Sequence, residues 1–182
     1  PSGKIISPTL ISPERYAWLY MAHSQRTGSG GFIQDLLNLL ARYHPRAKSL
    51  NPQGRKLILA NHWATLPTLQ RAVERTFRTT TELFGSPLNC SMSSDISYCS
   101  AFKADEAFGA ILDAFSYKWT GSCIANPEYE PEDLRRAVMH ALSSSEDTST
   151  PFLVVLVLPI WEDTPWTSAG IRNHRNMETL IK

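Results

Sequence analysis

The sequence has 182 residues, of which 42% are hydrophobic and 10% aromatic, which is enough for one domain with a sizeable core. Eighteen basic and 17 acidic residues give a net charge of +1, which excludes a strongly cationic nucleic-acid-binding protein but allows a local basic patch. Three cysteines without metal-ligand spacing predict a reduced, intracellular setting and no metal site.

Neither membrane association nor secretion is expected. The longest apolar run, residues 152–160, is too short to span a membrane. Residues 1–4 lead into no sustained apolar segment, so no signal peptide is predicted. A chain that starts with proline and ends at Ile181-Lys182 is expected to be a piece of a longer protein. Nothing in the sequence indicates an oligomeric state.

The first half of the chain is predicted to be helical. Ser12-Pro13-Glu14 combines a capping hydroxyl, a proline and an acid, and predicts a helix that runs to about Gln25. Apolar residues at helical spacing predict two more helices, over residues 32–43 and 66–77. The glycine-rich residues 28–31 follow a helix and lack a terminal Lys-Ser/Thr, so we expect a flexible linker rather than a phosphate-binding loop.

Basic residues gather after the second predicted helix, at Arg42, His44, Arg46 and Lys48. Cations are favourable at the carboxyl end of a helix dipole, so a solvated helix end is the favoured interpretation. Contact with an RNA backbone is the alternative.

The second half of the chain alternates strands and helices. β-rich residues 79–84 and a polar, irregular stretch at 90–107 precede a short strand or turn at 108–115. A strand at 123–125, a helix at 132–142 and a strand at 152–158 follow, the last apolar enough to be buried on both faces. This pattern predicts an α/β fold with a parallel sheet. We expect residues 1–78 to form a helical segment packed beside a core of residues 79–182.

Asn126-Pro127-Glu128-Tyr129 follows the strand at 123–125, where ligands of open α/β sheets bind. Methylation of an adenine amine needs carbonyl acceptors for its two hydrogens and a ring stacked on the base. Asn126, Pro127 and Tyr129 supply these groups. Taken alone, an Asn-Pro turn before a helix is common, so the motif by itself is a weak signal.

Several motifs occur in order along the second half of the chain. They are residues 84–90 (FGSPLNC), 98–102 (YCSAF), 108–109 (FG), 121–127 (GSCIANP) and the strand at 152–159 followed by Trp161. Their order resembles that in the cap-specific adenosine N6-methyltransferases, a family of WW-domain proteins that bind the phosphorylated tail of RNA polymerase II. The resemblance covers about residues 82–162.

This resemblance implies a Rossmann-like methyltransferase core, S-adenosyl-L-methionine as cofactor, and capped RNA as substrate. Asn126 and Pro127 would hold the target amine, and Tyr129 would stack on the base. The candidate cofactor-binding residues are Gly85, Ser86, Asn89, Phe108, Gly109 and Asp113. The family implies a nuclear location, and its contact with the polymerase tail is expected through regions outside this sequence.

The chain departs from the family pattern, which is Asn-Pro-Pro-Phe. Glu128 replaces the second proline and Tyr129 the phenylalanine. A tyrosine keeps the stacking surface, whereas Glu128 loosens the backbone and brings a negative charge near the RNA. Two alternatives therefore stay open. One is a catalytically weakened module that binds RNA or a protein partner, and the other is methylation of adenine in DNA.

Overall fold

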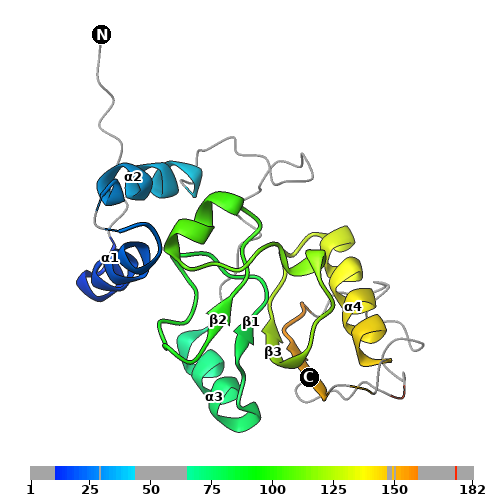
Figure 1. The fold of residues 1–182 in the computed structure, drawn as a ribbon. Coiled ribbons are helices and arrows are strands. Elements are labelled where there is room, and N and C mark those ends of the chain that lie inside the picture. The colour runs from blue at the N-terminus through cyan, green and yellow to red at the C-terminus, as the bar shows by residue number, and fades with distance from the viewer. Residues whose placement is uncertain are drawn as a thin grey trace.

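A parallel sheet lies at the centre of the computed structural model, which describes residues 11–28, 30–43, 65–146, 149, 151–159 and 175. Its strands are β1 (Thr81–Glu82), β2 (Ser97–Tyr98), β3 (Gly121–Ala125) and β4 (Phe152–Leu156), in the order β2-β1-β3-β4 (Figure 1). Because all the pairs are parallel, the carboxyl ends of the strands meet at one edge. The predicted α/β class is confirmed, and the sheet is compatible with a Rossmann-like fold.

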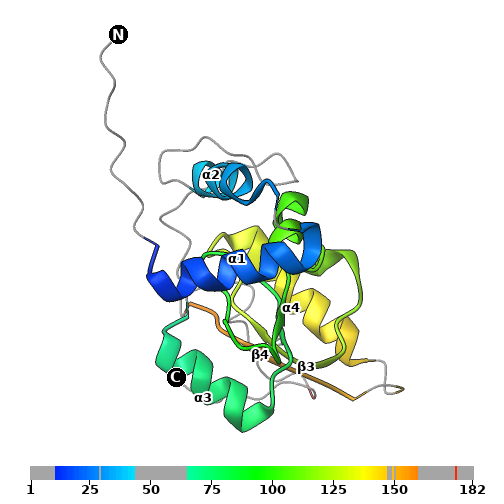
Figure 2. The same ribbon diagram turned by 60° about the vertical axis from the view of Figure 1, so that its left-hand side comes forward.

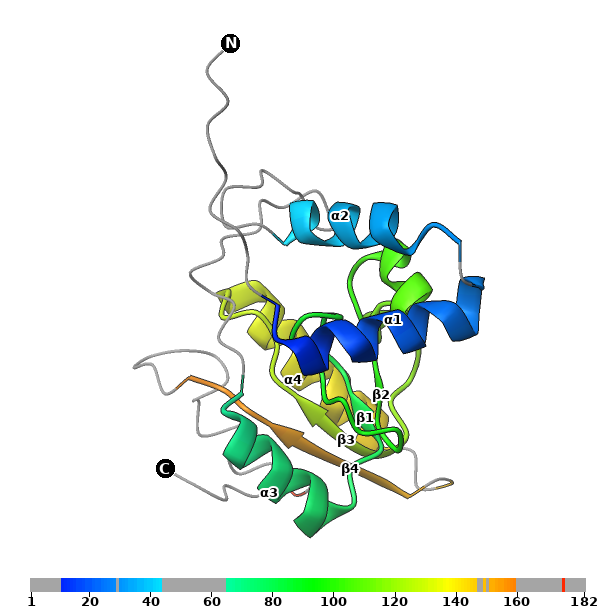
Figure 3. The ribbon, with the colours of Figure 1, turned by 90° about the vertical axis from the view of Figure 1, so that its left-hand side faces the viewer.

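Helices cover both faces of the sheet. The α-helices are α1 (Pro13–Thr27), α2 (Phe32–Arg42), α3 (Pro67–Phe77) and α4 (Pro131–Ser145). Two 3₁₀ helices, η2 (Lys103–Phe108) and η3 (Ala114–Ser116), lie between β2 and β3 in the chain. Helices α1 and α3 lie on one face and α4 on the other (Figure 3). Helix α2 lies over α1, farther from the sheet (Figure 2). None of the described helices is long and apolar enough to cross a membrane.

The predicted start of α1 is confirmed by its capping geometry. The hydroxyl of Ser12 accepts a hydrogen bond from the Arg15 amide at 3.2 Å, and proline occupies the first turn. The glycine-rich segment that follows supplies caps for two helices. Gly28 and Gly31 have φ angles of +80° and +78°, which let the chain reverse between α1 and α2.

The pleat of β3 directs its side chains alternately to the two helical layers. Cys123 and Ala125 are buried in the cluster that includes Ala137 and Ala141 of α4. The hydroxyl of Ser122 points the other way and donates to the carbonyl of Phe77 at 2.7 Å, which holds the end of α3 on the sheet.

Trp119 centres the core on the α4 side. It is fully buried, and its indole Nε1 donates to the carbonyl of Ala114 at 2.7 Å. The rings of Phe84 and Phe115 pack against it, as does the imidazole of His140, at 4.7 Å between ring centroids. This aromatic cluster fixes the segment between β2 and β3 against α4.

Four stretches of the second half differ in detail from their predictions. The β-rich stretch at 79–84 pairs at only two positions, and the stretch at 90–107 contains β2 and η2. Residues 108–115 are the end of η2, one isolated bridge between Cys99 and Ile111, and the start of η3. Strand β4 is not buried on both faces, because Leu153 is 44% exposed. In the first half, residues 57–60 (LILA) are also predicted to form a brief strand or a buried turn, but they lie outside the described residues.

Candidate functional site at the strand carboxyl ends

The loop after β1 carries three of the predicted cofactor-binding residues, Gly85, Ser86 and Asn89. A Cβ atom at Gly85 would lie 3.3 Å from the Cβ of Tyr98, so glycine lets the loop approach β2 closely. The side-chain oxygen of Asn89 accepts from both the amide and the hydroxyl of Ser86, at 2.8 and 2.9 Å. Asn89 therefore stabilises its own loop, and Ser86 is buried beneath it.

Arg15 of α1 holds the same loop from outside, a contact that sequence reasoning missed. Its guanidinium donates to the carbonyl oxygens of Cys90 at 2.7 Å and Pro87 at 3.3 Å, and lies 5.1 Å from the ring centroid of Trp18. Because these carbonyls belong to the loop that follows β1, helix α1 fixes the shape of one wall of the candidate site. Helical periodicity alone does not reveal such a contact.

The predicted catalytic residues follow β3, the strand next to β1 in the sheet. Pro127 is fully buried, whereas Asn126 and Tyr129 are half-buried. Pairing with the chain after β4 continues to the end of β3, where the Val157 amide donates to the Ala125 carbonyl at 2.8 Å. A buried proline after a paired strand end gives Asn126 a rigid backbone.

Tyr129 packs against a small cluster on α4 formed by Leu134 and Val138. Burial raises the pKa of its hydroxyl, so Tyr129 stays neutral across the physiological pH range. A neutral, half-buried ring beside Asn126 suits stacking on a base better than proton transfer.

Phe108 and Gly109 lie at the end of η2 and are held mainly from the α1 side. Phe108 is buried, and its carbonyl accepts from the Tyr98 hydroxyl at 2.9 Å. Gly109 has a φ angle of +97°, and its carbonyl accepts from Arg26 at 3.3 Å. Asp113 lies four residues after Gly109 in the chain, and its carboxylate caps η3 by accepting from the Phe115 amide at 3.0 Å.

A buried network just after β2 was not predicted. Asp105 is fully buried, and its carboxylate accepts from the hydroxyls of Ser100 at 2.5 Å and Tyr43 at 2.6 Å, and from the guanidinium of Arg42. Burial, and then the Asp105 charge, raise the pKa of Tyr43 above its usual range, so Tyr43 remains a donor. Nothing in the polar stretch at 90–107 distinguishes Asp105 from its neighbours.

This network corrects the interpretation of Arg42. Its guanidinium is neither part of a solvated helix end nor a contact for RNA, because it pairs with Asp105 and lies over the ring of Phe102, 5.5 Å from the centroid. His44, Arg46 and Lys48 lie outside the described residues. The end of α2 is thereby joined to the segment that follows β2.

A half-buried acid at the end of β1 was also missed. The carboxylate of Glu82 accepts from the side-chain amide of Gln70 at 3.0 Å and from the Ser91 amide at 2.9 Å. Desolvation raises the pKa of Glu82 despite these two donors, and the nearby charge of Glu74 adds to the rise. Glu82 thus joins α3 to the chain between β1 and β2.

Two aromatic rings and one carboxylate lie in the segments that follow β1 and β2. Half-buried rings of Phe84 and Phe115 pack edge to face, with centroids 5.2 Å apart, and the half-buried carboxylate of Asp113 lies two residues before Phe115. A carboxylate attracts a sulfonium or ammonium group, whereas the ring of Phe115 already has the guanidinium of Arg136 over it, 3.8 Å from the centroid. In the part of the chain that the structure describes, no group of His, Cys, Asp or Glu could hold a metal ion.

The fold and the position of these residues define an α/β protein whose candidate site lies at the carboxyl edge of a parallel sheet. A family model described as the phosphorylated CTD interacting factor 1 WW domain matches residues 15–182, so the chain belongs to that family. A comparison with curated proteins found no match. The match spans all four strands and includes every residue of the candidate site.

Proposed function

We propose that this protein is an S-adenosyl-L-methionine-dependent methyltransferase with a Rossmann-like core that acts on the N6 amine of adenosine in RNA, at the 2′-O-methyladenosine beside the mRNA cap. One observation carries the proposal. Asn126-Pro127 and Tyr129 follow the carboxyl end of β3, beside the loop that follows β1 in the same parallel sheet. Family membership supports it, because the resemblance that suggested the activity involves the same family.

The residues after β3 would act by accepting hydrogen bonds from the target amine. The amide oxygen of Asn126 and a backbone carbonyl held by Pro127 would accept its two hydrogens and increase electron density on nitrogen. Tyr129 would stack on the base and set its approach. The bound cofactor supplies the methyl group as a sulfonium. The proton that the amine loses is released to water, so no strong base is required.

Different candidate residues would contribute to the cofactor pocket in different ways. Gly85 and Ser86 would form one wall in a loop that Arg15 holds and in which Ser86 bonds to Asn89, and Asp113 would face the cationic end of the cofactor. Phe108, Gly109 and Asn89 would shape the walls, since their polar atoms already bond within the protein. Capped RNA as substrate, a nuclear location and contact with the polymerase tail through other regions belong to the same proposal.

One observation favours a second function. Glu128 is half-buried between Pro127 and Tyr129, where the family pattern has proline. A carboxylate here repels RNA phosphates and removes a rigid backbone step, which suits a weakened enzyme that binds RNA or a protein partner without turnover.

Calorimetry with S-adenosyl-L-methionine tests the enzyme reading first, and absence of binding by the folded protein would contradict it. In a methyl-transfer assay on capped RNA that begins with adenosine, we expect Asn126→Ala to lower the rate by about 100-fold or more, as removal of a preorganised polar group does. Asn38→Ala, on the exposed face of α2, is the matched control and should leave the rate unchanged.

Glu128→Pro separates the two functions. A large gain in rate identifies an impaired active site. No turnover by either form, together with intact RNA binding, assigns the protein to the binding module. Adenine-containing DNA serves as the comparison substrate.

A further inference from the structure

The outer face of α3 carries a row of three arginines that no function described so far uses. Arg71, Arg75 and Arg78 follow one another at intervals of four and three residues, so they lie along one side of the helix. All three are exposed, and within the described part of the chain none of them forms an ion pair. The one acid of α3, Glu74, has a buried carboxylate oxygen and faces inward.

The opposite side of α3 is anchored to the sheet, which fixes the direction of the arginine row. Gln70 bonds to Glu82 at the carboxyl end of β1, and the Phe77 carbonyl accepts from Ser122 near the amino end of β3. Helix α3 therefore runs antiparallel to the strands. The arginine row begins near the edge that carries the candidate site and extends about 10 Å away from it, at 1.5 Å per residue.

The surface beside the arginine row consists of small side chains. Thr68, Ala72 and Thr76 are exposed, small, and spaced by four residues, so they form a second line next to the arginines. Small side chains let a backbone approach the helix closely, and two of the three carry hydroxyls that can donate to phosphate oxygens.

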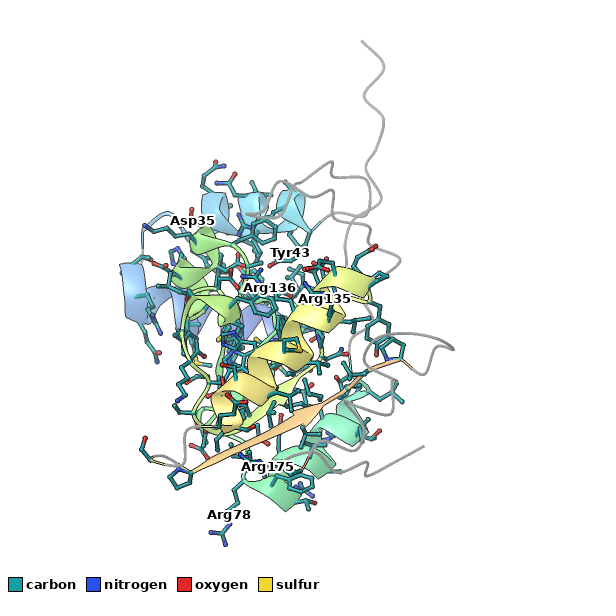
Figure 4. All side chains as sticks on the ribbon, turned by 90° about the vertical axis from the view of Figure 1, so that its right-hand side faces the viewer. Asp35, Tyr43, Arg78, Arg135, Arg136 and Arg175 are labelled. Carbon is teal, nitrogen blue, oxygen red and sulfur yellow. The ribbon has the colours of Figure 1, made fainter. Side chains whose placement is uncertain are left out.

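Arg78 stands at an unusual backbone position. It follows the last turn of α3 with a φ angle of +50°, in the left-handed region where glycine or asparagine is the usual residue. Its side chain extends away from the protein at the end of the helix (Figure 4). The left-handed turn thus continues the row beyond the helix and presents the third guanidinium outward.

We infer that the arginine face of α3 (Arg71, Arg75 and Arg78) binds the sugar-phosphate backbone of the RNA whose target base enters the site after β3. Guanidinium groups pair with phosphates through two parallel hydrogen bonds, and a regular row of them matches a regular row of phosphates. The alternation that turns Ser122 toward α3 also predicts this face for Asn126. This inference rests on the proposed function for the identity of the RNA. The claim that this surface binds phosphate groups does not depend on that function.

The test is the salt dependence of RNA binding by the full chain, measured by fluorescence anisotropy with a capped RNA that begins with adenosine. The plot of log K against log salt has a negative slope, and each phosphate contact to a single strand contributes about 0.7 to its magnitude. The triple variant Arg71→Gln/Arg75→Gln/Arg78→Gln should therefore reduce the magnitude of the slope by about 2. That change corresponds to a loss of affinity of about 100-fold at 0.1 M salt, which fades toward 1 M salt. Replacement of all three by lysine should keep most of the slope.

Arg75→Gln and Arg135→Gln form a matched pair of single variants. Both remove one exposed charge, but Arg135 lies on α4, on the other face of the sheet, paired with Glu132 at 2.6 Å (Figure 4). We expect the slope to fall by about 0.7 for Arg75→Gln and to stay the same for Arg135→Gln. Circular dichroism confirms that each variant folds.

An unchanged slope in the triple glutamine variant would overturn the inference. So would a triple variant that keeps RNA binding but loses binding to a phosphoserine peptide, because the surface would then serve a protein partner. If S-adenosyl-L-methionine does not bind but the slope falls as expected, the proposed activity fails and the phosphate-binding surface stands.

Discussion

Replacement of Asp105 by alanine should cost more stability than any other single loss of a carboxylate in the described part of the chain. The carboxylate is fully buried and receives hydrogen bonds from Arg42, Tyr43 and Ser100. Asp105→Ala removes all three acceptor contacts and breaks the ion pair with Arg42, whose side chain is 16% exposed. Loss of one partner of this ion pair is the dominant cost.

The magnitude follows from the contacts. Hydrogen bonds to a charged group contribute about 1.5–3 kcal/mol each, but three that share one carboxylate are not additive. Removal of one partner of a buried ion pair costs about 3–5 kcal/mol, which we take as the expected loss in the free energy of unfolding. For a chain of this length each kcal/mol shifts the melting temperature by about 2–4 °C, so Tm should fall by roughly 6–20 °C.

Urea denaturation followed by circular dichroism measures the loss, with thermal melting as a second observable. Asp105→Asn should lose nearly as much as alanine, because its amide N–H groups would face donors. Glu132→Gln is the matched control, since its pair with Arg135 is half-exposed and such surface ion pairs contribute little to stability. A loss below about 1 kcal/mol for Asp105→Ala would refute the idea that this network joins α2 to the segment after β2.

Two further predictions concern buried groups with raised pKa values. Desolvation raises the pKa of Glu82 in the folded state above its unfolded value of about 4.3. Between these two pKa values the folded state binds more protons than the unfolded state, so stability falls as the pH rises from the unfolded pKa through the folded pKa. Glu82→Gln keeps an acceptor for Gln70 and Ser91, so it should stabilise the protein at pH 8 and have little effect at pH 4. Urea titrations at the two pH values measure the free energy of unfolding, and an equal effect at both would contradict the prediction. Burial raises the pKa of Cys90 and Cys123 to about 12 and of Cys99 to about 11. These thiols should therefore not react with a disulfide reagent at pH 8 until urea unfolds the chain. Rapid reaction of the native protein would contradict this prediction.

Local chemistry made several helix boundaries predictable. The hydroxyl of Ser12 and the ring of Pro13 determine the start of α1 within three residues, and Pro67 and Pro131 stand in the first turns of α3 and α4. The position of Asn126-Pro127 at a strand end was equally local, because proline cannot continue the ladder of hydrogen bonds. Each of these signals acts over a few residues.

The remaining features depend on contacts between distant segments. Strand β2 has two residues and exists because Ser97 and Tyr98 pair with β1, which no periodicity over two positions can indicate. Asp105 is buried because Arg42, 63 residues earlier, reaches it. The burial of a polar side chain cannot be predicted until the groups that bond to it are known.

The contacts of Arg15 also matter while the chain is being synthesised. The guanidinium bonds to the carbonyl of a residue 75 positions later, so α1 leaves the ribosome well before its main partner exists. At about 5–20 residues per second that interval is roughly 4–15 s. An isolated helix of 15 residues is only marginally stable in water, so α1 frays during this interval. Helix α1 is therefore open to chaperones and proteases during translation until the loop after β1 emerges and Arg15 can bond to it.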